Sequence, residues 1–233
     1  LRKSGAGTQI LSGVNSYTGE TLISAGTLQV NAGGTTGSGA VMVENGGTLQ
    51  GAGSIRGSSF TAASGATVIV GEGTQQGNYG TLSFTPVSGA GSFDLQAGSM
   101  VVLGINPGGT SDLLSFTGSG SSTLLFNGDL SVTAPDGFVP TTTQVFKLLD
   151  WSGLTSAPTF ATRYTSAGLL LGNGDEAAGL NLPDIEGSGY FWDISAFMTS
   201  GTIAIVVPEP SRALLLGLAL AGLGLRRQRG RVW

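Results

Sequence analysis

"ISAGTLQVN", residues 23–31, holds the phrase that decides the fold, because its core recurs along the chain. A glycine, a small residue and alternating apolar residues begin at Gly26, Gly47, Gly65, Gly80 and Gly98, at similar but unequal intervals. Each phrase starts at a turn glycine and alternates with period two, which predicts a short β-strand. The sequence therefore predicts an all-β protein.

Strands this short cannot bury a hydrophobic face alone, but stacked rungs would share a continuous stripe of Leu, Val and Ile. A rung of about 18 to 21 residues fits a parallel β-solenoid. Asn45-Gly46-Gly47 would supply the positive φ that a corner needs. The alternative is a β-sandwich, whose turn signals recur about every 8 to 12 residues. We favour the solenoid because no clear two-residue hairpin joins strands over residues 1–100.

The sequence pattern changes from about Ser111. The predicted strands become longer, and Asn127-Gly128-Asp129 predicts a hairpin turn. We expect residues 1–110 to form the solenoid. Residues 111–207 should either continue it with irregular rungs or fold over its end as a β cap, which would cover unpaired strand edges. Residues 190–206 predict a closing strand pair, with Trp192 and Phe197 packed inward.

Residues 3–31 carry a longer pattern, "KSGAGTQILSGVNSYTGETLISAGTLQVN". The pattern resembles the autotransporter-associated β-strand repeat, whose phrase runs Lys-x-Gly-x-Gly-Thr-x-x-Leu-Ser-Gly-x-Asn-x-Tyr-x-Gly-x-Thr, followed by a strand and Gly-Thr-Leu. The matching positions are Lys3, Gly5, Gly7, Thr8, Leu11, Ser12, Gly13, Asn15, Tyr17, Gly19, Thr21, Gly26, Thr27 and Leu28. The resemblance implies a right-handed β-helix exposed at a bacterial surface. Beyond Asn31 the solenoid prediction depends on periodicity alone.

Charge is unevenly distributed along the chain. Half of the ten basic residues follow Pro208, and before it five basic residues face thirteen acidic ones, a net charge near −8. So acidic a body argues against nucleic acid as a partner. Because the chain opens at Leu1 in the middle of a pattern, we expect a fragment or processed form of a longer precursor.

Residues 208–231 form a tail of a different character. Residues 213–225 are uncharged Ala, Leu and Gly. As a helix they would span about 20 Å, which is shorter than the ~30 Å hydrocarbon core of a bilayer, although Arg212 could snorkel and extend the reach. A basic cluster follows, consisting of Arg226, Arg227, Arg229 and Arg231. By the positive-inside rule it would place the C-terminus in the cytoplasm, and the body outside the inner membrane. The alternative, a buried amphipathic helix, fits poorly because the run is apolar all round.

The order of features in the tail resembles the PEP-CTERM sorting signal. The matching motif is Val207, Pro208, Glu209, Pro210 and Ser211, followed by the apolar run and then the arginines. The resemblance implies recognition by an exosortase, a membrane enzyme that cuts near the motif and releases or reattaches the body at the surface of a Gram-negative cell. The two prolines would keep this segment extended and accessible.

Conventional catalytic groups are scarce. The chain has no histidine and no cysteine, which excludes Ser-His-Asp and Cys-His sites and most zinc sites. Two acidic pairs, Asp175/Glu176 and Asp184/Glu186, share the loop at residues 172–187. We interpret them as a solvated loop, with weak calcium binding as the alternative. Tyr17 and Tyr79 are interpreted as stacking residues of the solenoid in preference to sugar platforms. We predict no catalytic residue, metal site or cofactor.

The sequence therefore predicts an exported structural or adhesion-type protein of the surface or extracellular matrix. Its partners would be an exosortase, the inner membrane (transiently, through the tail), and exopolysaccharide or neighbouring proteins. A β-helix polysaccharide lyase or hydrolase is the alternative, although only Arg56, Lys147 and Arg163 could serve such a site beyond Lys3. A conventional autotransporter passenger would need about ten C-terminal amphipathic strands, whereas this chain carries a leucine run and arginines.

Overall fold

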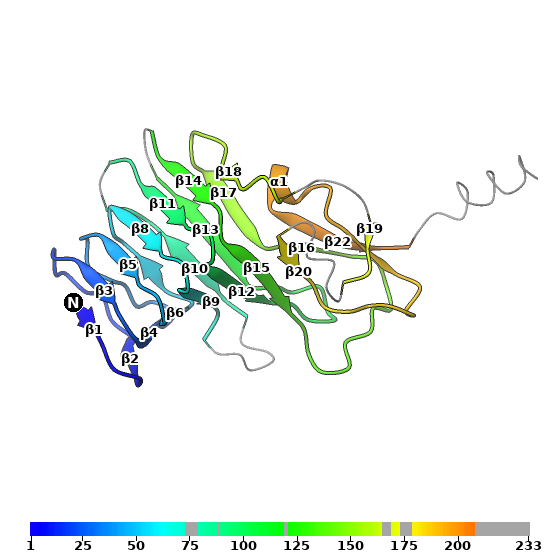
Figure 1. The fold of residues 1–233 in the computed structure, drawn as a ribbon, viewed down its shortest axis with the longest axis horizontal. Helices are drawn as coiled ribbons and strands as arrows, with labels where there is room; N and C mark the ends of the chain where they lie inside the picture. Colours follow the sequence, from blue (N-terminus) through cyan, green and yellow to red (C-terminus); the bar gives the residue numbers. More distant parts are fainter. Residues whose placement is uncertain (73–78, 88, 119–120, 165–168, 173–178, 208–233) are drawn as a thin grey trace, which may run out of the picture.

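The computed structural model describes residues 1–72, 79–87, 89–118, 121–164, 169–172 and 179–207. Their regular structure is almost entirely β, with one short helix, α1 (Phe197–Ser200). The strands stack into an elongated parallel solenoid, with the N-terminus at one end and the last strands at the other (Figure 1). The prediction of an all-β protein built as a parallel solenoid is confirmed.

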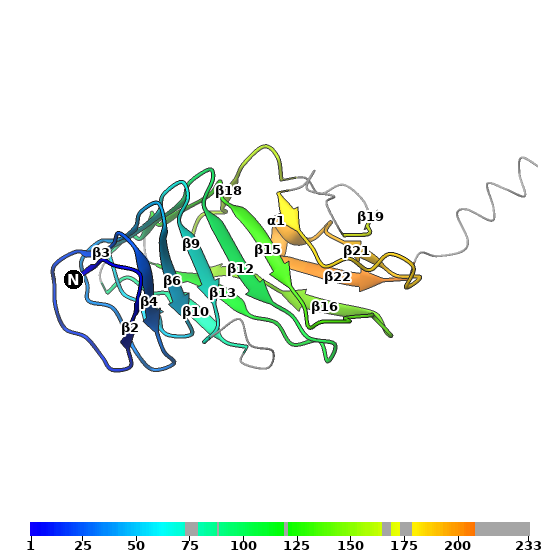
Figure 2. The same ribbon diagram turned by 60° about the horizontal axis from the view of Figure 1, so that its bottom comes forward.

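Three parallel sheets form the walls of the solenoid (Figure 2). The first sheet contains β1 (Arg2–Lys3), β3 (Thr21–Ile23), β5 (Val41–Val43), β8 (Ser59–Ala62), β11 (Ser92–Leu95), β14 (Thr123–Phe126) and β18 (Thr159–Phe160). The second contains β2 (Thr8–Leu11), β4 (Gly26–Val30), β6 (Gly47–Gly51), β9 (Thr67–Val70), β12 (Met100–Gly104), β15 (Asp129–Thr133) and β20 (Leu180–Asn181). The third contains β7 (Ser54–Ile55), β10 (Thr81–Phe84), β13 (Leu113–Thr117) and β17 (Leu149–Gly153).

Strands of successive rungs pair in register, so that equivalent side chains lie above one another. Residues 26–29 of β4 pair with residues 47–50 of β6, and both segments read Gly-Thr-Leu-Gln. Leu28 and Leu49 are fully buried, whereas the threonines and glutamines are partly exposed on the outer face. The period-two pattern therefore separates a hydrophobic inner column from polar outer columns.

The rungs differ in length, which corrects the predicted repeat. Thr48 pairs with Thr67 of the next rung, but Thr67 pairs with Met100, so the second of these two steps spans a much longer stretch of chain. The longer step passes through β10 of the third sheet, as the shorter step passes through β7, so the phrase at Gly80 lies on a different wall from the phrase at Gly47. Equal phrases in the sequence therefore do not always mark the same wall of the solenoid.

The Asn127-Gly128-Asp129 turn is a corner of the solenoid, and the predicted hairpin is wrong. β14 and β15 flank this turn but lie in different sheets, where each pairs in parallel with other rungs. A Cβ atom on Gly128 would lie 2.5 Å from Ser99 Oγ, in the corner of the preceding rung. Close stacking of corners therefore requires the glycine, and the Asn-Gly signal marks a bend between walls.

The corner at Gly46 follows the prediction. Gly46 has a φ of 78°, in the left-handed region that favours glycine. A Cβ atom there would meet nothing within 4 Å, so backbone conformation, and not lack of space, requires glycine at this corner.

Residues of the N-terminal pattern connect the first rung to the second. Lys3 is buried and donates hydrogen bonds from Nζ to the carbonyl oxygens of Gly5, at 2.6 Å, and Ala25, at 2.9 Å. Asn15 Nδ2 donates to the carbonyl oxygen of Thr35, at 2.8 Å. These side chains satisfy backbone acceptors that the corners leave unpaired, which explains why the pattern needs polar residues at these positions.

The core changes from aliphatic to aromatic as the rungs lengthen. The early rungs bury aliphatic residues such as Ile23 and Val43 in the inner column of the first sheet. Further along, the Phe84 ring lies 4.3 Å from that of Phe60 and 5.2 Å from that of Phe116, centroid to centroid. The third sheet widens the interior, and the larger rings fill it.

Antiparallel strands close the C-terminal end. This cap sheet runs in the order β16 (Gln144–Lys147), β22 (Thr202–Val206), β21 (Phe191–Asp193) and β19 (Leu169–Leu170). Trp192 and Phe197 are fully buried, as predicted. The Phe197 ring lies 5.6 Å from Phe160 of β18, which joins the cap to the solenoid. Residues 111–207 therefore contain further parallel strands of the three walls and the antiparallel cap sheet.

Truncating the centre of the aromatic core should be costly. Phe84→Ala is expected to lower the free energy of unfolding by about 3–5 kcal/mol, because it leaves a cavity among rings that cannot collapse into it. Urea denaturation followed by circular dichroism measures this change. Leu125→Ala, at a position 40% exposed on the neighbouring wall, is the control and should change it by less than about 0.5 kcal/mol. Equal losses in the two variants would contradict the aromatic core as the main support.

Candidate binding site and the sorting tail

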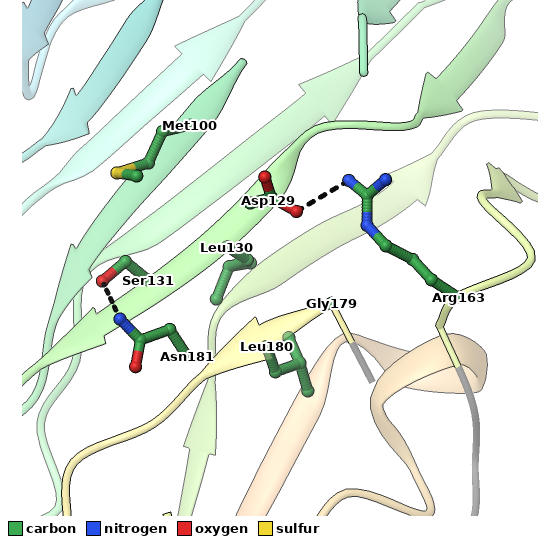
Figure 3. Close-up of a pocket in the computed structure, with 8 residues that line it drawn as sticks. All are labelled: Met100, Asp129, Leu130, Ser131, Arg163, Gly179, Leu180 and Asn181. Atoms are coloured by element: carbon green, nitrogen blue, oxygen red, sulfur yellow. Dashed lines mark hydrogen bonds and ion pairs between the residues drawn. The ribbon is translucent and has the colours of Figure 1, made fainter. Parts of the chain in front are cut away.

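A cavity of about 270 Å³ opens where β12, β15 and β20 of the second sheet lie side by side (Figure 3). Its lining residues are Met100, Asp129, Leu130, Ser131, Arg163, Gly179, Leu180 and Asn181. Leu130 and Leu180 are buried and form the apolar floor. The remaining side chains supply a carboxylate, a guanidinium, an amide, a hydroxyl and a thioether at one place.

The register of the second sheet brings these groups together. Asp129 and Ser131 alternate with buried Leu130 on β15, so both side chains lie on the outer face. Met100 pairs with Asp129 on one side, and Asn181 pairs with Ser131 on the other. Asn181 Nδ2 lies 3.5 Å from Ser131 Oγ (Figure 3). The polar lining is therefore a direct product of parallel in-register pairing.

Arg163 enters the cavity from outside the sheet and is held at three points. Its Nη2 atom lies 2.9 Å from Asp129 Oδ1 and also donates to the carbonyl oxygen of Asn127. The guanidinium carbon lies 5.6 Å from the centroid of the Tyr164 ring. The Tyr164 hydroxyl donates to the Gly128 carbonyl oxygen at 2.6 Å, and burial raises the pKa of this hydroxyl. The cavity therefore presents an ion pair whose two charges cancel.

A second polar group, Asp112, is buried at the junction of the second and third sheets and is 5% exposed. Asp112 Oδ1 accepts a hydrogen bond from the Gly80 N–H at 2.8 Å, and Oδ2 accepts one from the Gly104 N–H at 2.7 Å. Burial raises the pKa of Asp112 to about 6, against the lowering effect of these two bonds. Asp112 therefore fastens two rungs.

The two tyrosines considered as sugar platforms are both engaged with the solenoid. The Tyr17 hydroxyl is 2.8 Å from Thr21 Oγ1, and the Tyr17 ring occupies the space beside Gly37. The Tyr79 hydroxyl donates to the Ile105 carbonyl oxygen at 2.9 Å. Burial, followed by the charge of Asp112, raises the pKa of Tyr79. Both hydroxyls are therefore held by groups of the solenoid itself.

The sorting motif begins where the cap ends. Val207 is 52% exposed and directly follows β22, a strand paired on both sides, with β16 and β21. The rest of the motif, the apolar run at 213–225 and the basic cluster lie outside the described residues. These motif and cluster residues are Pro208, Glu209, Pro210, Ser211, Arg226, Arg227, Arg229 and Arg231. Within the described part of the chain, no helix is long and apolar enough to cross a bilayer.

The predicted bases and acids are distributed over several places. Lys147 Nζ lies 2.9 Å from Asp150 Oδ1. Although partial burial would raise the pKa of Asp150, hydrogen bonds from Lys147 and Ser152 lower it. Of the acidic loop, Asp175 and Glu176 lie outside the described residues, and Asp184 Oδ1 accepts the Glu186 N–H at 2.9 Å. Over the described ranges, no three His, Cys, Asp or Glu side chains gather as they would around a metal ion.

The sequence indicates that Arg163 is a base and that Asp129 lies in a turn, but it does not predict that the two side chains form an ion pair. Strand alternation indicates that Asp129 and Ser131 point outward. It gives no sign that Asn181, far along the chain from Ser131, pairs with it, because the chain between them leaves the wall and returns.

The raised pKa of Asp112 predicts a pH dependence of stability. Its pKa is near 3.8 in the unfolded chain and about 6 in the folded one, so ionisation costs more in the folded state. Stability from this group is fully present below about pH 4 and is lost as the pH rises through 6, by at most about 3 kcal/mol. Urea unfolding at pH 4 to 7 measures it. The difference between wild type and Asp112→Asn, which cannot titrate, should shift over this window, and parallel profiles would contradict the prediction.

Two protein families match parts of the chain. The passenger-associated-transport-repeat matches residues 1–30, which form the first rung and part of the second. The PEP-CTERM protein-sorting motif matches residues 206–228, from the end of β22 onward. No curated protein is similar enough to count as a relative. The sorting motif implies export, with the tail anchored in the membrane before an exosortase processes it. The chain thus carries a passenger-associated transport repeat at its start and a PEP-CTERM sorting motif at its end, the combination of an exported surface protein.

Proposed function

We propose that this protein is a structural or adhesion-type component of the bacterial surface or extracellular matrix, delivered there by exosortase processing of its tail. The observation that carries the proposal is the position of the PEP-CTERM match, which starts at the last residue of β22. The last described strand of the cap sheet ends at that point. The sorting tail is therefore a removable targeting signal, and the folded body is the part that it delivers.

The position of β22 limits where processing can occur. Residues 202–206 pair with both β16 and β21, so a cut within them would remove a central strand from the cap sheet. Only the short segment 208–212 separates Val207 from the apolar run, which gives a reach of at most about 20 Å. We expect the enzyme to act within this short segment, with the cap close to the membrane surface.

A non-enzymatic role fits the groups that the body brings together. Cleavage of a glycosidic bond commonly needs two carboxylates flanking the bond. The described lining of the cavity contains one, Asp129, which is engaged with Arg163. Lys147 is likewise paired with one carboxylate, Asp150. A lyase or hydrolase is the second candidate, and it would need a further carboxylate beside one of these bases.

Sorting can be tested directly in hosts with and without an exosortase. We expect the intact mass of the exported body to fall by the mass of the tail beyond about residue 207 only where the enzyme is present. The double variant Pro208→Ala/Pro210→Ala should keep its tail, because the extended segment is lost. Arg56→Ala, on the body, is the control and should be processed like wild type. Equal loss of the tail in both hosts would contradict exosortase processing.

A truncation series tests whether the cap is complete without the tail. A chain that ends at Val207 should unfold at the same urea concentration as the full chain, within error. A chain that ends at Ser200 loses β22, leaves β16 and β21 without their shared partner and exposes Trp192. It should lose most of the near-ultraviolet circular dichroism of Trp192 and unfold at lower urea. If the chain that ends at Val207 is less stable than the full chain, the tail belongs to the fold.

A further inference from the structure

We propose that the cavity at β12, β15 and β20 is the anchoring end of a binding surface for an uncharged polysaccharide, which lies across the strands of the second sheet. The proposal rests on the proposed function, because an extracellular body is where such a polymer is met. It adds the place of binding, the groups that bind, and the charge class of the polymer.

The chemistry of the cavity matches neighbouring sugar hydroxyls, each of which both donates and accepts hydrogen bonds. Asp129 accepts, Arg163 donates, and the Asn181 amide does both. Met100 is 44% exposed at the rim and offers an apolar surface to the C–H face of a ring. The volume of about 270 Å³ lies just below that of sites for drug-sized ligands and suits about one sugar ring.

From the cavity, two outer columns run along the second sheet toward the N-terminus. One column continues from Met100 through Thr67, Thr48, Thr27 and Thr8. The other continues from Asn181 and Ser131 through Val102, Ile69, Gln50 and Gln29. Because neighbouring strands lie about 4.7–4.9 Å apart, each rung adds one group to each column at a constant step. A polymer of regular repeat can follow such a track, first over the apolar residues and then over the hydroxyls and amides.

Charge selects a neutral polymer over an acidic one. The chain before Pro208 carries five basic and thirteen acidic residues, so its overall field repels a polyanion. Within the cavity, the one cation of the described lining, Arg163, is held 2.9 Å from the Asp129 carboxylate. Binding an acidic sugar would require Arg163 to leave this partner, whereas a neutral sugar can bond to both groups as they stand.

The test uses the full chain in native gels that contain hydroxyethylcellulose, dextran or polygalacturonate. We expect retardation by at least one neutral glucan and none by polygalacturonate. Asn181→Ala and Thr48→Val should each weaken the retardation at least threefold. Thr61→Val is the matched control, since it removes the same hydroxyl from a partly exposed position on the outer face of the first sheet, and it should change nothing.

A charge-switch variant sharpens the test. Asp129→Asn removes the partner of Arg163, so retardation by polygalacturonate should appear while the fold is retained. Absence of binding to both glucans, preference of the wild type for polygalacturonate, or equal effects of Thr48→Val and Thr61→Val would each overturn the proposal.

Sorting is measured separately, by the mass of the exported wild type and of Asn181→Ala in the exosortase host. If both are exported and processed but bind no glucan, the polysaccharide surface is refuted and the proposed function stands. If the purified chain binds but is neither exported nor processed in that host, the proposed function fails and the binding surface stands.

Discussion

In-register hydrogen bonding between parallel rungs is the constraint on which the rest of this structure depends. The backbone N–H and C=O groups of each strand find hydrogen-bond partners only if the next rung places a strand beside it in register. Side chains therefore form columns that continue from rung to rung. Leu28 and Leu49 share an inner column, and Thr27 and Thr48 an outer one. Hydrophobic burial then follows from alternation, and no rung needs a core of its own.

The same constraint leaves unpaired strand edges wherever a terminal rung has no further rung beside it. At the C-terminal end, β16, β22 and β21 turn antiparallel and cover the last rungs with Trp192 and Phe197. In the first described rung, Lys3 Nζ donates hydrogen bonds to backbone carbonyl oxygens of its own rung and the next. Because β22 is a central strand of the cap and the sorting match starts at its last residue, the folded body and the sorting match overlap at Val206.

The third wall borders the aromatic core, and longer connections between walls explain the cavity. Beyond Thr67 the rungs lengthen, larger rings such as Phe84 fill the interior, and long connections leave the second wall and return to it. One connection delivers Arg163 to the end of β15, and another brings Asn181 beside Ser131. Asp129, Arg163 and Asn181 are far apart in the sequence. They come together where the long connections return to the second wall.

The sequence by itself determined the class of the fold, the alternation of buried and exposed positions, the inward Trp192 and Phe197, and the two terminal motifs. Each of these depends on local spacing or on a contiguous pattern, which a single chain displays. Only the tertiary structure decided that the phrase at Gly80 belongs to another wall, that Asn127-Gly128 is a corner and not a hairpin, and that Asp129, Arg163 and Asn181 share a cavity. The physical reason is register: which residues meet across rungs depends on the length of chain between walls, and that length is free to vary as long as the backbone bonds between rungs are made.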